Sequence, residues 1–427
     1  MTQQMLDEKE VDRRPGAGIR AVEVHWAVSA LFLSKGYSGT TMSDIADAVG
    51  ILPGSLYHHF ESKEAAAVAI LDEFNEDMHG LAVQLRRSGH SSKNPEARLR
   101  ELCSTATSLA QRHATAVRLR AFDPPTSSSD RFRAAIHYRP AGLYRLWRSA
   151  ADDLAATVPD EYFDPGMLAH ALQVASIAAV TDRPSTIDSQ ESSRIFCDSL
   201  LYGVVEDCPD DADLDTSAPM AAVRELVAEW TLPSATDDIR GVIIAAARTE
   251  FARRGFANTT VRDVSDAAGV PMGTIYRRID SMEALFVEIA QNYSDQVDRA
   301  LHAALTTDPS AKAATLDALS FVTANANKKF REETSMMALA WSQGTEGQSS
   351  FDRTYRKSAS ERMSMLVEIL ANGFDDGTLR TACSPAVFAP HLRTMLWIPF
   401  DDHDRASMKR IRRFTRGHLL RGALPTP

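Results

Sequence analysis

The feature that most constrains this 427-residue chain is a gapless internal repeat. The stretch from Gly36 to Ala65 aligns with the stretch from Gly255 to Ala284 at a constant offset of 219 residues, and 12 of the 30 aligned pairs are identical. Self-similarity of this extent indicates two homologous units joined in tandem. Any fold for the chain must therefore provide the same local structure twice.

The sequence predicts an all-α fold of at least two domains. Apolar residues recur at three- and four-residue spacing, without alternating strand-like stretches. The chain is also longer than one hydrophobic core usually supports. The expected organisation is a flexible N-terminal arm (1–17), a first helix-turn-helix domain (18–65), a first helical effector and dimerisation domain (66–206), an acidic linker with a possible short helix (207–237), a second helix-turn-helix domain (238–285) and a second helical effector and dimerisation domain (286–427).

Composition narrows the functional classes. The formal net charge of −10 disfavours a protein whose whole surface binds nucleic acid, although a local basic patch can still do so. A polar N-terminus and the lack of any run of about 20 apolar residues predict a cytoplasmic protein that does not enter a membrane. The four cysteines lie far apart, so we expect neither a metal site nor a cofactor. Common catalytic motifs are missing, so an enzyme is not expected.

The repeated segment predicts three short helices in each unit. The first covers about 19–34 in one copy and 239–254 in the other, and each is followed by a glycine and an aromatic residue, as at a left-handed helix stop. The apolar face of this first helix is predicted to comprise Val22, Trp26, Ala30 and Leu33 in one copy, and Ile243, Ala247 and Phe251 in the other.

The second and third helices form the predicted helix-turn-helix. The second begins with a capping box, Thr41-x-x-Asp44, and ends at Gly50, which can adopt the positive φ of a tight turn. The third begins near Pro53 in the first copy and near Met272 in the second. In this arrangement the second of the two joined helices enters the major groove of DNA.

Small and aromatic residues follow at the start of the third helix. Gly54 and Gly273 either let a sugar-phosphate backbone approach closely or relieve packing against the first helix. Tyr57 and Tyr276 either donate their hydroxyl groups to phosphate oxygens or belong to the core. The sequence leaves both alternatives open.

The next positions carry charge that differs between the copies. His58 and His59 of the first copy correspond to Arg277 and Arg278 of the second. These side chains either meet phosphate groups or form a solvated face. The second copy has the fixed positive charge in either case.

With these residues in place, segments 19–71 and 238–290 resemble the DNA-binding region of the tetracycline-repressor (TetR) family of transcriptional regulators. The resemblance rests on the phrases GSLYHHFESKEAA and GTIYRRIDSMEAL together with the preceding helix and turn. It implies a helix-turn-helix domain carried on a larger helical domain that binds a small ligand and dimerises through its last two helices. The predicted DNA-contacting residues are Thr41, Ser43, Leu52, Pro53, Gly54, Ser55, Tyr57, His58, His59, Lys63, Thr260, Arg262, Pro271, Met272, Gly273, Thr274, Tyr276, Arg277 and Arg278.

Each copy also departs from the family pattern. Leu52 and Pro271 stand where the family has a polar N-cap for the recognition helix, and the family lysine is present as Lys63 but replaced by Met282. The two copies are therefore expected to recognise different half-sites of an imperfect palindrome, or one copy is expected to bind weakly.

The effector halves are predicted to dimerise. Helices near 165–181 and 190–206 of the first unit and near 385–399 and 406–420 of the second are expected to pack together, which makes one chain a pseudo-dimer. The alternative is a homodimer of chains with four DNA-binding heads. The acidic end of the first unit and the basic last helix of the chain either dock or stay solvated, or the basic helix receives an anionic ligand such as an acyl-coenzyme A.

Aromatic and methionine residues of the effector halves line a ligand cavity or fill an ordinary core. The candidate ligand-binding residues are Tyr144, Trp147, Met337, Trp341 and Met365. The predicted function is a ligand-responsive, sequence-specific transcriptional regulator of double-stranded DNA, a repressor released by a small apolar or acyl-type ligand. The alternative is a protein-interaction or regulator-sequestering module with one or both DNA-binding heads degenerate.

Overall fold

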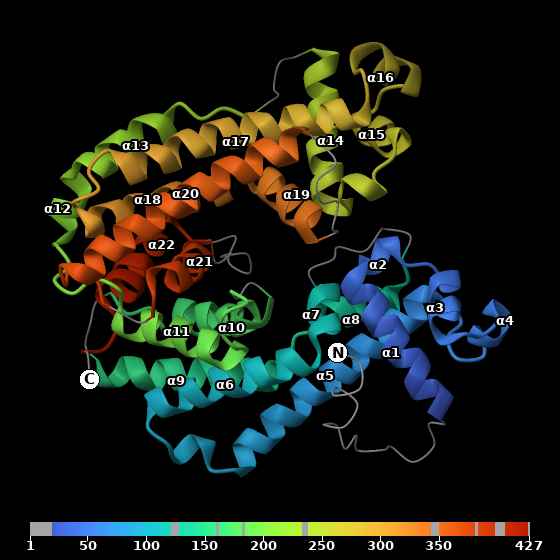
Figure 1. The fold of residues 1–427 in the computed structure, drawn as a ribbon, viewed down its shortest axis with the longest axis horizontal. Coiled ribbons are helices and arrows are strands. Elements are labelled where there is room, and N and C mark those ends of the chain that lie inside the picture. Colours follow the sequence, from blue (N-terminus) through green and yellow to red (C-terminus); the bar gives the residue numbers. More distant parts are fainter. Residues whose placement is uncertain are drawn as a thin grey trace.

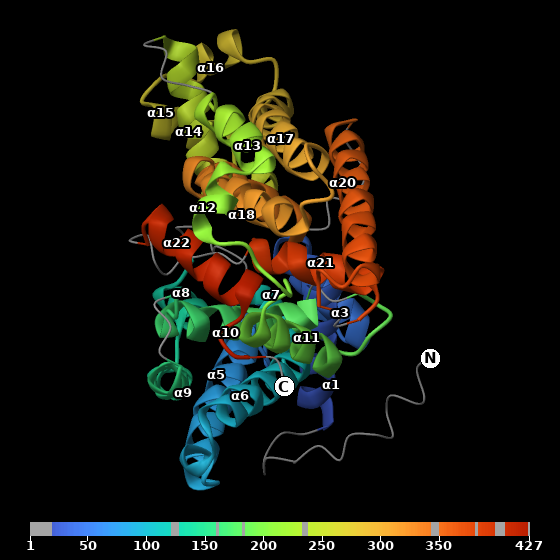
Figure 2. The ribbon, with the colours of Figure 1, turned by 90° about the vertical axis from the view of Figure 1, so that its left-hand side faces the viewer.

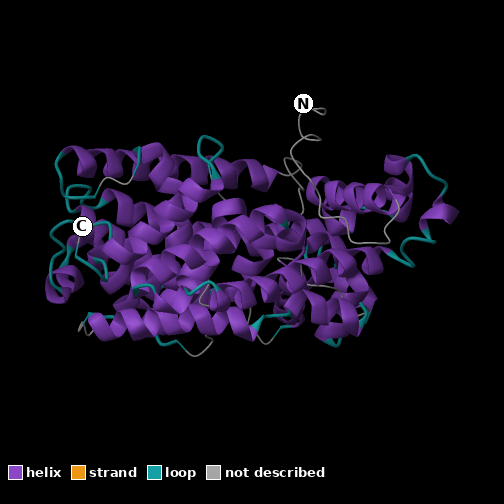
Figure 3. Ribbon diagram, turned by 90° about the horizontal axis from the view of Figure 1, so that it is seen from below, coloured by secondary structure: helices purple, strands orange, loops and turns teal. Residues whose placement is uncertain are grey.

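The computed structural model of the protein describes residues 19–120, 128–158, 162–181, 184–232, 238–342, 350–380, 383–397 and 406–425. Every regular element in these ranges is helical (Figure 1; Figure 3). The β-type pairing found among them is an isolated antiparallel bridge between Val205 and Leu379. The all-α prediction is confirmed. The predicted N-terminal arm, 1–17, lies outside the described residues.

The first unit, which we call unit one, runs from α1 to α11. Its helices are α1 (Ile19–Ser34), α2 (Gly36–Gly39), α3 (Met42–Val49), α4 (Pro53–Leu56), α5 (Lys63–Arg87), η1 (His90–Ser92), α6 (Pro95–Arg112), α7 (Ala114–Arg120), α8 (Asp130–His137), α9 (Ala141–Thr157), α10 (Pro165–Thr181) and α11 (Ser189–Tyr202). We call α1 to α4 head one.

The second unit, unit two, runs from α14 to the end of the described chain. Its helices are α14 (Ile239–Arg254), η2 (Phe256–Asn258), α15 (Val261–Ala268), α16 (Met272–Arg278), α17 (Met282–Thr306), α18 (Lys312–Lys329), α19 (Arg331–Ser342), α20 (Ser350–Asp375), α21 (Pro385–Leu396), α22 (Met408–Phe414) and the π-helical turn η4 (Thr415–Arg421). We call α14 to α16 head two.

The structural repeat continues beyond the repeat in sequence. The long helices α5 and α17 have 25 residues each, and α6 and α18 have 18 each. Both long helices are capped in the same way, because the Ser62 hydroxyl accepts from the Ala65 amide at 3.0 Å and the Ser281 hydroxyl accepts from the Ala284 amide at 2.9 Å. Both units therefore place their heads on equivalent long helices.

The buried face of α1 differs from the expected one. Trp26, on the expected face, is 53% exposed, and Val22 and Leu33 are each more than a third exposed. The face expected for α14, in contrast, is buried. Two apolar stripes run along α1 at helical spacing, so periodicity alone does not choose between them. The repeat does choose, because subtracting 219 from the buried residues of α14 gives the residues that α1 buries, Val24, Val28 and Phe32.

The segment expected as an acidic linker contains two helices, α12 (Asp211–Thr216) and α13 (Ala218–Ala228). α13 packs along α17 and α18 of unit two (Figure 1). After it, Trp230 is 3% exposed and its indole N–H donates to the Gln296 carbonyl at 3.2 Å. This connector is therefore built onto unit two, although residues 233–237 lie outside the described ranges.

The two heads lie toward one side of the molecule, and the helices that join the units lie toward the other. In Figure 1 the heads are on the right, whereas α11, α21 and α22 are on the left; Figure 2, turned to that left-hand side, shows α21 and α22 between α10 and α11 on one side and α18 on the other. α10 and α11 of unit one contact α21, and α11 also contacts η4. Unit one and unit two therefore share one helical interface.

The centre of this interface is reciprocal. The amide of Val205 donates to the Leu420 carbonyl at 2.9 Å, and the amide of Leu424 donates to the Leu201 carbonyl at 2.8 Å. The two bonds are related by the offset of 219, because Leu424 is the counterpart of Val205 and Leu420 is the counterpart of Leu201. Such an exchange of identical contacts is the signature of an isologous two-fold interface. Here both halves come from one chain.

Two equivalent glycines allow the two backbone segments to come this close. Gly203 ends α11 with φ of 71°, and Gly422 ends η4 with φ of 89°. A Cβ at Gly203 would overlap the backbone of Arg421, and a Cβ at Gly422 would overlap the backbone of Tyr202. Both the left-handed conformation and the absence of a side chain are thus required at these positions.

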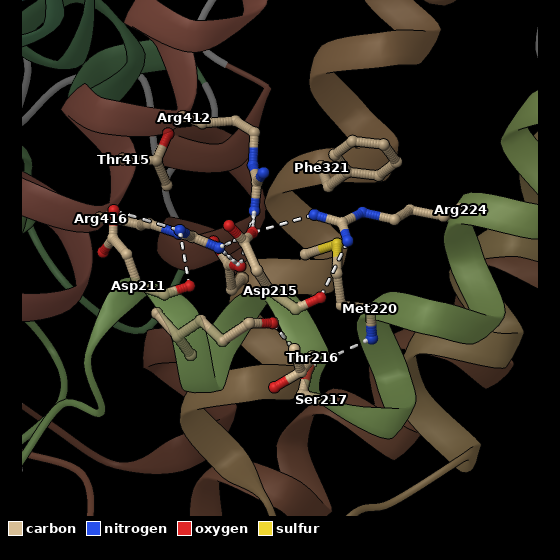
Figure 4. Close-up of polar contacts among 12 residues, drawn as sticks. Asp211, Asp215, Thr216, Ser217, Met220, Arg224, Phe321, Arg412, Thr415 and Arg416 are labelled. Carbon is tan, nitrogen blue, oxygen red and sulfur yellow. Dashed lines mark hydrogen bonds and ion pairs between the residues drawn. The ribbon is translucent and has the colours of Figure 1, made fainter.

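Opposite charges join the connector to the end of the chain (Figure 4). Arg416 is 3% exposed and donates to both carboxylate oxygens of Asp317, at 3.0 and 2.6 Å. Asp215 of α12 accepts from Arg412 at 2.8 Å and from Arg416 at 2.9 Å. Although burial raises it, these hydrogen bonds hold the pKa of Asp215 below its usual value. Moving the last helix would separate these pairs and leave buried charges without a partner, which is costly. The network therefore fixes the position of that helix.

Replacing Gly203 by alanine should destabilise the protein much more than replacing Gly377. Gly377 has nearly the same φ, 74°, but open space around its Cα, so G377A tests the backbone conformation alone. We expect the free energy of unfolding to fall by about 1–2 kcal/mol in G377A. In G203A it should fall by about 3 kcal/mol or more, because the new methyl group also overlaps the opposing backbone. Urea denaturation of the full chain measures both. Equal losses would contradict the close contact.

Candidate nucleic-acid interface

The turn and second helix of head one have the predicted local geometry. Gly36 has φ of 74°, and the Thr40 hydroxyl donates to the Gly36 carbonyl at 2.8 Å. The capping box is formed, because the Asp44 amide donates to the Thr41 hydroxyl at 3.1 Å and the Thr41 amide donates to the Asp44 carboxylate at 2.8 Å. Gly50 closes the helix in the left-handed region. These predictions are confirmed.

Head two repeats this geometry. The Asp263 amide donates to the Thr260 hydroxyl at 3.2 Å, the Thr260 amide donates to the Asp263 carboxylate at 2.8 Å, and Gly269 has φ of 66°. In both heads the cap carboxylate also binds a cation from the end of the first helix. Lys35 lies 2.7 Å from Asp44, and Arg254 lies 2.7 Å from Asp263.

This shared pair fixes the charge of the cap. The hydrogen bond from Lys35, and then that from Thr41, holds the pKa of Asp44 well below its ordinary value. The hydroxyl groups of Thr41 and Thr260 donate to the same carboxylates at 2.6 and 2.7 Å, so their protons are used within the cap. Both heads thus have the same ion pair before the turn, which we call the ionic clamp: Lys35 with Asp44 in head one and Arg254 with Asp263 in head two.

The recognition segments are solvent-exposed in both heads. A Cβ built on Gly54 or on Gly273 would meet no atom within 4 Å, so internal packing does not explain either glycine. Tyr57 is 54% exposed and Tyr276 is 66% exposed, which rules out the core alternative for these tyrosines. The space around each recognition helix is open to a partner.

The positions predicted to face bases are also accessible. Leu52 is 76% exposed and Met272 is 45% exposed. The remaining members of this set are exposed, except Thr274, which is half-buried: Ser43, Pro53, Ser55, Arg262, Pro271 and Thr274. Neither recognition helix has a side-chain N-cap. α4 spans only four residues, whereas α16 spans seven, so head two presents the longer helix.

The cationic positions differ in how they are held. His58 and His59 are exposed in head one. Arg277 folds back and donates to the Gly273 carbonyl at 3.1 Å. Arg262 and Arg278 have no hydrogen bond or ion pair within the part of the chain that the structure describes. Head two therefore offers two unpaired guanidinium groups beside its recognition helix.

Lys63 is predicted to contact DNA, but in the structure its side chain binds the turn of its own head. Its ammonium donates to the carbonyls of Tyr37 and Thr40, both at 2.9 Å, and lies 4.4 Å from the centre of the Tyr37 ring. Burial lowers its pKa. The side chain holds the turn of head one against α5. Unit two has Phe256 and Met282 at the equivalent positions, so the ammonium-to-carbonyl hydrogen bonds cannot form there.

A cavity of about 490 Å³ lies in unit two beneath α10 of unit one. Its apolar wall includes Leu301, Leu319 and Met363, and α10 contributes Val174 and Ala178. Arg362 lies at one polar part of the wall, 2.8 Å from the Asp298 carboxylate. The cavity is thus an apolar space with a few placed polar groups, the usual composition of a small-molecule site.

The candidate ligand-binding residues fall in several environments. Met337 lines the cavity, whereas Met365 is not among its lining residues. Tyr144 is 42% exposed, and Trp147 is fully buried in the core of unit one. The side chain of Trp341 lies outside the described residues. Periodicity could not separate these cases, since core and cavity residues share the same helical spacing.

The described residues contain neither a metal-binding cluster nor a membrane-spanning helix. No group of three or more histidine, cysteine, aspartate or glutamate side chains in those ranges is arranged to hold a metal ion. No described helix combines the length and apolar character needed to cross a bilayer.

Comparison with known proteins matches the two heads. The family model for bacterial regulatory proteins of the tetR family matches residues 27–70 and 243–289. The chain is 43% identical over 82 residues to the HTH-type transcriptional repressor KstR2 of Rhodococcus jostii, covering 19% of this chain and 40% of the relative. It is 33% identical over 140 residues to KstR2 of Mycobacterium tuberculosis, covering 33% of this chain and 66% of the relative. The chain thus spans less than two thirds of the length of these relatives.

A solved structure, the ketosteroid transcriptional regulator KstR2 of Mycobacterium tuberculosis, aligns with a TM-score of 0.38 at 17% identity. The alignment covers 44% of this chain and 94% of that one.

Replacing Lys63 by methionine should loosen head one. K63M removes two charge-assisted hydrogen bonds to the carbonyls of the turn, so we expect the free energy of unfolding to fall by about 1–2 kcal/mol. Urea denaturation and amide hydrogen exchange of residues 36–41 measure the effect. Met282→Leu, at the equivalent position of head two, is the matched control and should change stability by less than about 0.5 kcal/mol. Unchanged exchange in K63M would refute the structural role.

Proposed function

We propose that this chain, which carries two TetR-family helix-turn-helix segments in tandem, is a sequence-specific DNA-binding transcriptional regulator. The observation that carries the proposal is the pair of exposed recognition segments, each containing a glycine with open space around its Cα. A double helix can approach the backbone closely only where no side chain intervenes. Both heads satisfy that condition.

Within each head the residues divide into two roles. Tyr57 and Tyr276 donate to phosphate oxygens and fix the register, and Arg278 adds a phosphate contact in head two. The residues at the start of each recognition helix face base edges. Arg262, exposed at the start of α15, reaches a guanine edge, whereas its counterpart Ser43 does not carry that charge. The two heads therefore recognise unlike half-sites.

One chain supplies both heads of the functional unit. The reciprocal hydrogen bonds around Gly203 and Gly422 support an intramolecular pseudo-dimer in place of a dimer of chains. Two heads held by one rigid interface suit an imperfect palindrome whose half-sites are about one helical turn apart, ~34–36 Å.

A small ligand regulates this binding. The cavity of unit two fits an apolar or acyl-type molecule with one polar end, because apolar side chains form most of its wall and Arg362 with Asp298 lies at a polar part. The ligand lowers the affinity for DNA by binding better to the state in which the heads are wrongly placed. The similarity of the heads to transcriptional repressors supports repression as the direction of control.

A protein-interaction module with degenerate heads is the second candidate. The absence of a side-chain cap on both recognition helices and the short α4 favour it. A measurement of DNA binding by the full chain distinguishes the two functions.

Duplexes selected from random DNA by the full chain should bind with strong salt dependence. Tyr57→Phe and Tyr276→Phe should each weaken binding five- to tenfold, the effect of about 1 kcal/mol for one hydrogen bond. Tyr144→Phe, an exposed tyrosine of α9, is the matched control. Arg278→Ala should reduce the slope of log affinity against log salt by about 1. Fluorescence anisotropy between 50 and 200 mM salt measures all four variants. No salt-sensitive binding to any duplex would favour the interaction module.

The selected site should contain two unlike half-sites, and the protein should be monomeric. Light scattering of the free protein should give a mass near 46.8 kDa, that of one chain, because the interface is closed within the chain. A stable species of twice that mass would reject the pseudo-dimer.

A further inference from the structure

α19 of unit two faces two sites at once. Arg331, Thr334 and Met337 line the cavity. Between them in sequence, Glu332 and Glu333 contact α14, the first helix of head two. A single helix of 12 residues therefore both lines the cavity and contacts the first helix of head two through its two glutamates, a contact that we call the grip.

The grip is a buried ion pair. Arg248 is 7% exposed and Glu333 is fully buried. The guanidinium donates through Nε and Nη2 to the two oxygens of Glu333, the second at 3.1 Å, and Nη2 also lies 3.0 Å from Glu332. The Thr249 hydroxyl adds a hydrogen bond to Glu332 at 2.9 Å.

Such a pair transmits position well. A bidentate Arg–carboxylate contact is geometrically specific, and breaking a buried pair leaves an unpaired charge at high cost. A displacement of α19 therefore carries α14 with it more readily than it breaks the pair. The recognition helix follows, since α14 packs against α15 and α15 against α16.

The equivalent residues of unit one cannot form such an ion pair. Subtracting 219 places Ser29 opposite Arg248, and Thr115 and Ala116 of α7 take the places of Glu332 and Glu333 at an offset of 217, the offset between α6 and α18. The contact between them is one hydrogen bond, from the Thr115 hydroxyl to the Ser29 carbonyl at 3.3 Å. Arg118 of α7 adds an exposed hydrogen bond to the Leu33 carbonyl at 2.8 Å, so α7 is joined to head one by hydrogen bonds to backbone carbonyls and not by a buried bidentate ion pair.

In unit one, the region that corresponds to the cavity is occupied by α9, whose Trp147 is the counterpart, at the offset of 219, of the cavity-lining Leu366 of α20. The counterparts on α5 of Tyr293, Val297 and Leu301 are as buried as those cavity-lining residues, so the difference between the units comes from α9. α9 packs against α5, α6 and α10, and its Trp147 is fully buried in that core. The buried counterparts on α5 are Phe74, Met78 and Ala82.

We propose that the chain is an asymmetric regulator, in which occupation of the cavity of unit two moves head two through α19 and the Arg248–Glu333 pair and leaves head one unswitched. The inference rests on the proposed role of that cavity as the effector site. One head then holds its half-site in both states, and ligand controls the contribution of the other.

The test fills the cavity without a ligand. Ala359 lines the cavity from α20, so Ala359→Trp occupies part of its volume. Amide hydrogen exchange of the full chain, read by mass spectrometry, should change at least threefold in residues 239–278 and 331–342 and remain unchanged in residues 19–56. An equal change in both heads would show that the interface around α10 transmits the signal and would overturn the proposal, as would no change in head two.

A second set of variants tests the ion pair itself. Glu333→Gln combined with A359W should abolish the response of residues 239–278. Because a broken buried pair can unfold the head, the double variant R248M/E333L keeps apolar volume in place of the charges, a replacement that proteins often tolerate. A response that survives in the R248M/E333L background would overturn the proposal. Thr115→Val with A359W is the matched control and should respond as A359W alone.

The readout also separates this inference from the proposed function. Hydrogen exchange needs no DNA, so coupling of the cavity to head two can hold while DNA selection fails. Conversely, a chain that binds DNA through both heads but shows equal responses in them refutes only the asymmetry.

Discussion

The backbone contact between the ends of α11 and η4 is the constraint on which the rest of the structure depends. Each of the two homologous units has an equivalent helix end at this contact. The backbone amide of Val205 donates to the Leu420 carbonyl, and the backbone amide of Leu424 donates to the Leu201 carbonyl, so each end supplies hydrogen-bond partners for the other. A contact of this kind needs a second copy in a one-unit protein. Here the second copy is tethered, so the contact forms at a high effective concentration, and its geometry sets the relation of the heads.

Covalent fusion also allows the two copies to diverge, which identical subunits cannot do. The heads have kept the capping box, the left-handed glycine and the ionic clamp, since these features follow from local backbone requirements. The effector halves have diverged. Unit one fills its interior with α9 and Trp147, whereas unit two keeps a cavity. A homodimer with the same change would lose or keep both cavities together, so only the tandem arrangement can specialise one half.

The sequence predicted the heads well and the long-range contacts poorly. The turn at Gly50 and the cap at Thr41 are set by residues within a few positions, and both were predicted. The exposure of Tyr57 was left open by the sequence, because it depends on how the recognition helix packs. The buried face of α1 was mispredicted because two stripes shared one period, although the repeat register would have resolved it. The pair between Arg248 and Glu333 joins residues 85 apart, and no local rule connects them.

The same limit applies to the electrostatics of the C-terminal helix. From the sequence, its basic residues were equally suited to an acidic partner within the chain, to solvent or to an anionic ligand. In the fold, Arg412 and Arg416 bind Asp215 and Asp317, and Arg421 binds Asp211 at 2.7 Å. These cations are therefore already neutralised and do not contribute to binding an anion.

This neutralisation bears on how a chain of net charge −10 can bind DNA. Since Arg412, Arg416 and Arg421 are paired inside the protein, they add little to the proposed attraction to phosphate, whereas the cations of the heads lie where DNA is proposed to bind. Those of head two, Arg262 and Arg278, are unpaired among the described residues, whereas head one has histidines where head two has Arg277 and Arg278. In the proposed complex with DNA, head two would therefore supply the larger electrostatic share of binding. Under that proposal, control of head two alone would be enough to weaken the complex.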